Sequence, residues 1–347
     1  MGGATTTDGD GHGILEIARR LADDVLFPAA GGIDTADAVP RSQLDLFADA
    51  GLYGLVGSAD HGGLGASPST VRAAVEVLAG GCLTTTFVWA QHHGLVRALE
   101  AAAPSPGWDR WLRRLCRGEC RAGLALGGLL PGEVRLRAEP VGDGWVVEGT
   151  SPWVSGWGLI DVVFVAARGP DDTLVWLIVD AVEREGLTAD RQHLGAVDAS
   201  VTVTAHFAGV AVAADRLVRV EPYSPARYNV PDVLRQNGYL ALGVAGRCCR
   251  LLGPTPFDAE LTACRDRLGH ADEPGIAAAR AAASELALRA AATLVVHSGS
   301  RAAIRHEHPE RLAREALFLL VFGTRPPIRA ALLGRLGSQP AEEGQAV

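Results

Sequence analysis

The chain has 347 residues, with 32 Lys+Arg, 40 Asp+Glu and a formal net charge of −8. Apolar residues make up 48% and charged residues 21%, which is typical of a folded globular protein and excludes a disordered one. The acidic balance argues against a nucleic-acid groove, and because all 32 cations are arginine, lysine-based phosphate loops and Schiff-base chemistry are excluded.

The cysteines and the first residues of the chain predict a reducing environment. Six cysteines stand at positions 82, 116, 120, 248, 249 and 264, and none forms a CxxC pair. Residues 1–13 are rich in Gly, Thr and Asp, whereas a signal peptide is basic and then apolar. We therefore expect buried thiols in a cytoplasmic protein. No run of ~18 apolar residues occurs, so we expect no membrane span.

The periodicity of the apolar residues divides the chain into three segments. Helical spacing prevails between Ile14 and Leu115, and strand-like alternation or short apolar bursts follow from about Arg121 to Val220. After Tyr228 the helical spacing returns. We expect three domains, over residues 1–120, 121–222 and 223–347. The clearest predicted helices cover residues 71–78, 87–99, 233–252, 277–297, 310–322 and 327–336.

Local spacing alone reveals no catalytic or metal-binding constellation. Ser155 lacks the preceding glycine of a nucleophile elbow. His306 and His308 are too close in sequence to bind one zinc ion from a helical face, and we expect no metal site. The pair His92 and His93 lies in an apolar helix, where core or interface histidines are the simplest interpretation.

Four stretches of the sequence share a pattern: residues 52–55 with 62–65 and 76–79, residues 144–155, residues 241–245, and residues 310–316 continuing through 322–324 to 328. Taken in order, they resemble the acyl-CoA dehydrogenase superfamily. The resemblance implies an α+β fold with an N-terminal helical domain, a middle β domain and a C-terminal helical bundle. It also implies an FAD-dependent oxidoreductase that acts on the α,β bond of an acyl thioester, carried by CoA or by a carrier protein, with an unknown electron acceptor. Family members are oligomers, so a homo- or hetero-oligomer is implied.

The resemblance also implies which residues bind the flavin. Trp153 would lie against the isoalloxazine ring, and the Ser155 hydroxyl would lie near its reactive N5 edge, roles that an indole and a hydroxyl suit. Leu126 and Gly127 align with the family strand whose backbone amides hold the pyrimidine end of the flavin. Arg265 matches, in a degraded motif, an arginine on the FAD pyrophosphate of a neighbouring subunit.

The sequence departs from the family at the catalytic base, so the catalytic residue is unknown. The dehydrogenases remove the substrate's α-proton with a glutamate. Its two family positions fall here on Gly323 and Val233, neither of which binds a proton, and Asp232 is one residue out of register. The C-terminal domain is also shorter by about one long helix, between Gly269 and Ala277.

Three functions are therefore open. The first is an acyl-thioester dehydrogenase with a base not yet located. The second is a flavin-dependent monooxygenase of the same superfamily, in which no glutamate is needed and His92 or His93 would lie near the flavin. The third is a non-catalytic subunit of a heteromeric acyl-CoA dehydrogenase, whose partner supplies the glutamate.

Overall fold

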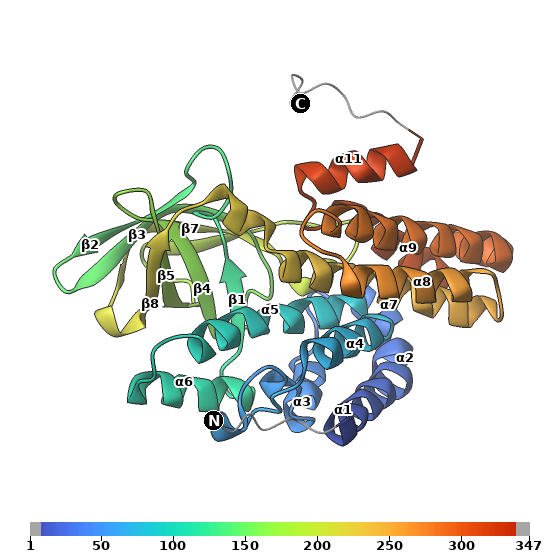
Figure 1. Cartoon of the computed structure of the whole chain (residues 1–347), viewed down its shortest axis with the longest axis horizontal. Coiled ribbons are helices and arrows are strands. Elements are labelled where there is room, and N and C mark those ends of the chain that lie inside the picture. The colour runs from blue at the N-terminus through green and yellow to red at the C-terminus, as the bar shows by residue number, and fades with distance from the viewer. Residues whose placement is uncertain (1–7, 338–347) are drawn as a thin grey trace.

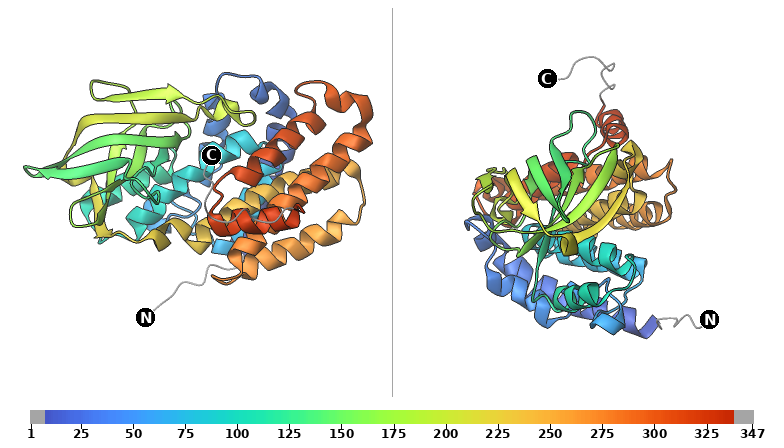
Figure 2. Two further views of the ribbon diagram at one scale, coloured as in Figure 1. Left: turned by 90° about the horizontal axis from the view of Figure 1, so that it is seen from above. Right: turned by 90° about the vertical axis from the view of Figure 1, so that its left-hand side faces the viewer.

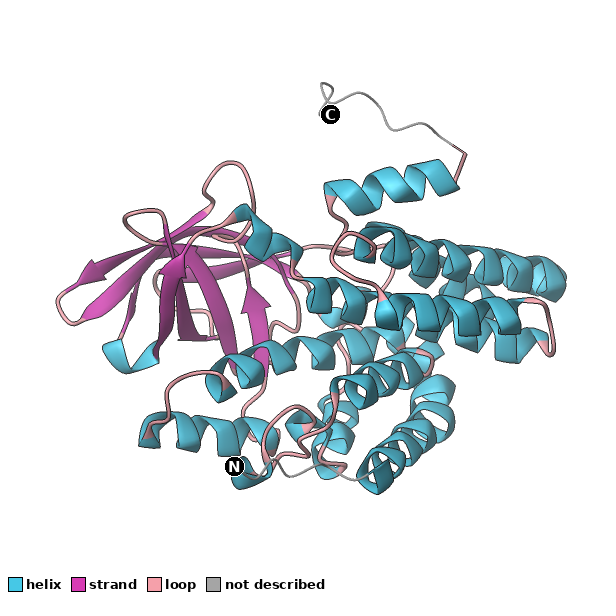
Figure 3. Ribbon diagram, viewed as in Figure 1, coloured by secondary structure: helices cyan, strands magenta, loops and turns pink. Residues whose placement is uncertain are grey.

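The polypeptide folds into helices, then a sheet, and then helices again (Figure 1). The structure is a computed structural model that describes residues 8–337. The predicted α+β fold is confirmed, with N-terminal helices, a middle β sheet and a C-terminal helical bundle (Figure 3). The division at residues 120/121 and 222/223 remains our proposal for the domain boundaries.

The N-terminal part contains short helices whose starts are encoded locally. Ser67 accepts a hydrogen bond from the Thr70 amide and is followed by proline, and Ser105 does the same with the Trp108 amide. Serine caps followed by proline are strong helix-start signals. The elements are α1 (Asp8–Arg20), a π-helical turn (Leu21–Leu26), α2 (Phe27–Asp34), α3 (Arg41–Asp49), α4 (Pro68–Ala79), α5 (Leu83–Glu100) and α6 (Pro106–Cys116).

The middle part is one mixed sheet with the strand order β6-β7-β3-β2-β4-β5-β8, and β1 pairs with β4 in parallel. Strands β4 and β5 are buried almost throughout, because apolar side chains cover both faces of the sheet. Residues of α5 and α6 form part of one of these apolar clusters. The strands are β1 (Ala122–Ala125), β2 (Leu136–Val141), β3 (Gly144–Val154), β4 (Val162–Arg168), β5 (Thr173–Asp180), β6 (Leu187–Arg191), β7 (Val203–Val212) and β8 (Leu217–Pro222).

The C-terminal part is a bundle in which α9 lies against its neighbours (Figure 2). The predicted gap is present, since only residues 271–275 join α8 to α9 and no long helix lies between them. Helix α8 was not predicted from the apolar periodicity of the sequence. The helices are α7 (Pro231–Leu252), α8 (Phe257–His270), α9 (Ile276–Ser298), α10 (His308–Val321) and α11 (Pro326–Arg335).

The N-terminal and C-terminal helices share one apolar core. Helices α4 and α7 approach so closely that a Cβ added at Gly243 would lie 2.3 Å from the carbonyl oxygen of Glu76. All six cysteines are free and buried. Within residues 8–337, no helix is long and apolar enough to cross a bilayer.

Candidate flavin site

The end of β3 presents an indole to solvent in an unusual backbone conformation. Trp153 has φ = 64° and is 61% exposed. The register between β3 and β7 shifts between Ser151 and Val154, so that the chain bulges at Trp153. A left-handed conformation costs a non-glycine residue about 1–2 kcal/mol, and here the strand pairing on either side of the bulge imposes it. The fold therefore exposes a large apolar side chain at a strained position, as functional sites often do.

Ser155 follows this indole and is fixed by a row of hydroxyl groups. It is buried, and its Oγ lies 2.8 Å from Oγ1 of Thr202, which lies 2.9 Å from Oγ of Ser200. Three hydroxyls joined by two hydrogen bonds use two of their three protons. When the row runs from Ser200 to Ser155, the Ser155 proton remains free to donate to another acceptor.

Leu126 and Gly127 lie beside the same part of β3. The Gly127 amide donates to Oγ of Ser151 at 3.1 Å, and a Cβ added at Gly127 would lie 2.5 Å from the Thr150 carbonyl oxygen. Glycine is required there by this close approach. The structure thus brings Leu126 and Gly127 next to the Trp153 segment, but the Gly127 amide already has a protein acceptor.

Arg265 lies elsewhere, in the helical part of the molecule. It is on α8, and its guanidinium binds both carboxylate oxygens of Glu76 on α4. Among the described residues, its side chain makes no hydrogen bond or ion pair with the segment around Trp153. That Arg265 acts on the cofactor of a neighbouring subunit stays a prediction.

Of the two family positions of the base, one lies beside an amide side chain and the other lies one helical turn before that residue. A Cβ added at Gly323, which has φ = 61°, would lie 2.8 Å from Nδ2 of Asn237. Val233 is half exposed and lies one helical turn before Asn237 on the same face of α7. Asp232 points into solvent and pairs with Arg235. Neither position therefore holds a carboxylate, and the Asn237 amide lies beside Gly323.

His92 and His93 are core residues held in the neutral form. Nδ1 of His92 accepts a hydrogen bond from the Ala122 amide at 3.1 Å, so the ring proton is on Nε2. His93 packs edge-on against Trp89, and neither of its ring nitrogens has a hydrogen-bond partner among residues 8–337. Burial lowers the pKa of His92 to about 3 and the pKa of His93 well below its usual value. Neutral rings in this position are poor proton donors.

Asn237, Tyr228 and Arg325 were not predicted as site residues from the sequence. The Arg325 guanidinium lies 3.4 Å above the Tyr228 ring, and its Nε donates to the Tyr228 carbonyl oxygen at 3.0 Å. One signal was present in the sequence: in the gapless match to the family's C-terminal motif, Arg325 stands where that motif has threonine. Asn237 gave no signal, because its relation to Gly323 depends on how α7 packs.

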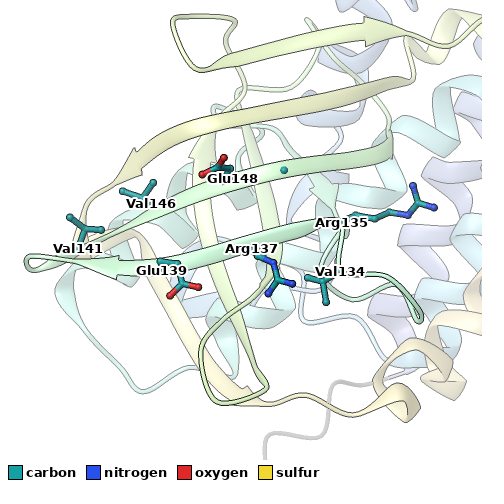
Figure 4. Close-up of a pocket in the computed structure, with 8 residues that line it drawn as sticks. Val134, Arg135, Arg137, Glu139, Val141, Val146 and Glu148 are labelled. Carbon is teal, nitrogen blue, oxygen red and sulfur yellow. The ribbon is translucent and has the colours of Figure 1, made fainter.

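A pocket of about 380 Å³ lies on the outer surface of the hairpin formed by β2 and β3 (Figure 4). Arg137 and Glu148 face each other across the two strands there, and Arg135 and Glu139 add further charges. None of the predicted site residues lines this pocket. We assign no role in the proposed reaction to it.

Comparison with known proteins supports a family assignment. Residues 10–119 match the family model "Acyl-CoA dehydrogenase, N-terminal domain". The chain is 25% identical over 187 residues to 3-sulfinopropanoyl-CoA desulfinase of Paraburkholderia xenovorans, covering 51% of this chain and 48% of that protein. It is 26% identical over 176 residues to (2S)-methylsuccinyl-CoA dehydrogenase of Cereibacter sphaeroides, covering 48% of this chain and 31% of that protein. The matched region is thus less than two thirds of either relative.

The likeness of fold extends over nearly the whole chain. A glutaryl-CoA dehydrogenase of Mycobacterium smegmatis, solved in complex with FADH2, superposes with a TM-score of 0.75 at 19% identity, covering 97% of each chain. At this identity the structure shows the shared fold, while the family model and the two relatives add a match in sequence. Residues 10–119 are thus similar in sequence to the N-terminal domain of acyl-CoA dehydrogenases, and the chain shares the acyl-CoA dehydrogenase fold over nearly its whole length.

Proposed function

We propose that this protein binds FAD at the end of β3 and oxidises an acyl thioester at its α,β bond. The observation that carries the proposal is Trp153, whose indole is 61% exposed at a strained backbone position. An indole offers a large flat surface for an isoalloxazine ring. A bound flavin would cover this side chain, which explains why the protein alone leaves it exposed. When bound, FAD supplies the acceptor for the hydride that leaves the β carbon.

The residues of this chain fit FAD in part. Trp153 offers the ring surface, and Ser155 offers a hydroxyl donor once the row of hydroxyls points toward it. The Gly127 amide does not fit, because it already donates to Ser151. Arg265 keeps Nη1 without a partner among the described residues, so that it can bind a phosphate while paired with Glu76.

Asn237 favours a second candidate function. A dehydrogenase needs a group that accepts the α-proton, and a carboxamide does not accept one near neutral pH. A flavin-dependent monooxygenase, or a non-catalytic subunit paired with a glutamate-bearing partner, does not need that group on this chain. His92 and His93 are buried in the neutral form, and three of their four ring nitrogens have no hydrogen-bond partner among the described residues. This argues against a proton-transfer role for the two histidines in a monooxygenase.

The partners follow from the same proposal. We propose an acyl-CoA or carrier-bound acyl thioester as the substrate, and a homo- or hetero-oligomer as the assembly. The chain's electron acceptor is not specified by any residue described above. A cytoplasmic location stays a prediction that rests on the six free thiols.

The first experiment is the visible absorption spectrum of the purified protein before and after FAD is added and excess flavin removed. We expect flavin bands that survive desalting, and weaker bands in W153A. The exposed Val141 on the same sheet provides a control, since V141A should retain FAD as the wild type does. A protein that stays colourless with FAD would contradict the proposal.

The second experiment separates the two candidate functions. Anaerobic addition of an acyl-CoA panel should bleach the flavin bands if the chain oxidises acyl thioesters with its own residues. Oxygen consumption with reduced flavin and substrate, without anaerobic bleaching, would favour the monooxygenase instead. Bleaching that appears only after a glutamate-bearing homologue is added would favour the subunit.

A further inference from the structure

Arg325 is a half-buried cation without an acidic partner. It immediately precedes α11, and all its hydrogen bonds go to backbone carbonyl oxygens: Nε to Tyr228 at 3.0 Å, and Nη1 to Gly323 at 3.0 Å and Thr324 at 3.4 Å. Among residues 8–337 no carboxylate lies within ion-pair distance of it, and Nη2 makes no hydrogen bond. Desolvation by burial lowers the pKa of this arginine, the direction expected for a cation without a compensating charge.

The guanidinium is held in a fixed orientation. Its Cζ lies 3.4 Å from the centroid of the Tyr228 ring, and its carbonyl contacts join two segments that are 97 residues apart in sequence. The contact with the ring and the hydrogen bonds to three carbonyl oxygens restrict rotation, so little further entropy is lost when the remaining donor binds an anion. The Arg325 guanidinium is therefore preorganised to bind an anion, whereas a solvated surface arginine loses rotational freedom when it binds one.

A second arginine increases the positive charge at the same segment. Arg280 on α9 is 2% exposed, and its Nη2 donates to the carbonyl oxygens of Leu319 at 3.2 Å and Phe322 at 3.4 Å. Its other side-chain partner is the hydroxyl of Ser284. Carbonyls at the end of α10 stabilise this cation in part, but it too lacks a carboxylate among the described residues.

The charge at this place is thus opposite to that of the family. Gly323 and Val233 stand where the resemblance implies a glutamate, and the guanidinium groups of Arg280 and Arg325 donate to the carbonyl oxygens of Phe322 and Gly323. A buried or half-buried charge is normally compensated by an opposite one. The compensating group that this chain lacks would come with the ligand.

We propose that Arg325 binds an anionic oxygen group of the substrate through Nη2. The group is either a carboxylate at the far end of the acyl chain or a phosphate of CoA, both of which pair with a guanidinium fork. This inference rests on the proposed function, since it names the chemistry of the acyl thioester that the same site accepts.

The test compares three probes by calorimetric titration of the FAD-loaded protein: glutaryl-CoA, butyryl-CoA and glutaryl-pantetheine, which lacks the phosphates. If Arg325 binds the acyl carboxylate, R325Q should weaken both glutaryl probes about tenfold and leave butyryl-CoA unchanged. If it binds a phosphate, R325Q should weaken both CoA probes and leave glutaryl-pantetheine unchanged. Equal affinities of wild type and R325Q for all three probes would overturn the proposal.

Arg329 provides the matched control. It lies one turn further along, on α11, is exposed, and makes no side-chain hydrogen bond or ion pair among the described residues. R329Q removes the same charge and should leave all three affinities unchanged. A loss in R329Q equal to that in R325Q would mean that general charge, and not the fixed guanidinium, is responsible, which also overturns the proposal.

Two further readouts keep the result interpretable. R325K retains the charge but not the planar guanidinium, and it should bind the preferred probe more weakly than wild type and more tightly than R325Q. If R325Q does not fold, the weaker binding by R325K than by wild type still tests the proposal. If the wild type retains FAD and binds the probes but R325K and R325Q bind them equally well, only the role of Arg325 is wrong. If the wild type binds no probe at all, the proposed function fails together with it.

Discussion

Arg265 on α8 forms a bidentate ion pair with Glu76 on α4, 189 residues away in the sequence. Nε of Arg265 lies 3.0 Å from Oε2 of Glu76, and Nη2 lies 2.7 Å from Oε1. The Glu76 side chain is only 11% exposed, and both of its carboxylate oxygens accept hydrogen bonds from this arginine. The arginine that the resemblance assigns to the cofactor is thus also a tie between the N-terminal and C-terminal helices.

This double role leads to a first prediction. R265Q and E76Q each break the pair and should lower the free energy of unfolding by about 1 kcal/mol, measured by urea denaturation. Only R265Q should lower FAD affinity, because E76Q leaves the guanidinium in place. Arg267, exposed two residues later on α8, supplies the control, and R267Q should change neither quantity. FAD retention in R265Q equal to that of wild type would remove Arg265 from the cofactor site.

The order of secondary structure was predictable, whereas this pair was not. Helices α7, α9, α10 and α11 and the centres of β3, β4, β5 and β7 follow from apolar periodicity, which is a local property. Helix α8 was not predicted, because Gly253 and Pro254 indicate a turn and the residues after them show little amphipathic periodicity. No local signal links Glu76 to Arg265, or Asn237 to Gly323, since these contacts arise from packing.

The same limit applies to the conformation of Trp153. A tryptophan in a strand pattern predicts an extended residue, and only the register shift between β3 and β7 reveals the left-handed one. The resemblance named Trp153 and Ser155, but the row of hydroxyls through Thr202 and Ser200 depends on a segment that lies about fifty residues away and has no motif of its own.

A second prediction uses the left-handed backbone at Trp153. Glycine adopts this conformation without a steric penalty, so W153G should be more stable than W153A by about 1 kcal/mol, the reverse of the usual order. Both variants lack the indole and should retain FAD equally poorly. Thermal and urea unfolding of the FAD-free proteins measure the first difference. A W153A protein at least as stable as W153G would contradict the strain, independently of any flavin.

A third prediction concerns the buried histidines. Their folded pKa values are depressed below the usual 6.5, so their stabilising contribution is complete above that pH and is lost as the pH falls. As the pH falls below 6.5, each histidine should lower the free energy of unfolding by about 1.4 kcal/mol per pH unit. This loss should end where the pH reaches the pKa of that histidine in the folded protein. Unfolding free energies near pH 7 and pH 5 measure this slope.

Replacement of each histidine separates titration from hydrogen bonding. H93F removes two buried nitrogens without partners, so it should flatten the slope with no loss of stability near pH 7. H92F should also flatten it, but it should cost about 1–3 kcal/mol near pH 7 because the Ala122 amide loses its acceptor. An unchanged slope in H93F would show that His93 is not held neutral in the folded protein.

The last prediction restores a carboxylate near Asn237. G323E is a poor choice, because Gly323 has φ = 61° and its Cβ would lie 2.8 Å from Nδ2 of Asn237. Val233 is 50% exposed on the first turn of α7, where a glutamate fits without strain, and V233E should change stability by no more than about 0.5 kcal/mol. A carboxylate at this helix start is also favoured by the helix dipole.

If the missing base limits the reaction, V233E should increase the rate of anaerobic flavin bleaching by acyl-CoA at least about a hundredfold, the usual scale of a positioned general base. V233Q has the same shape without the proton acceptor and should bleach at the wild-type rate. The rate in V233E should rise with pH through the carboxylate's titration. Equal rates in V233E and V233Q would mean that the lack of a glutamate does not limit oxidation, and would favour a reaction of this site that needs no base.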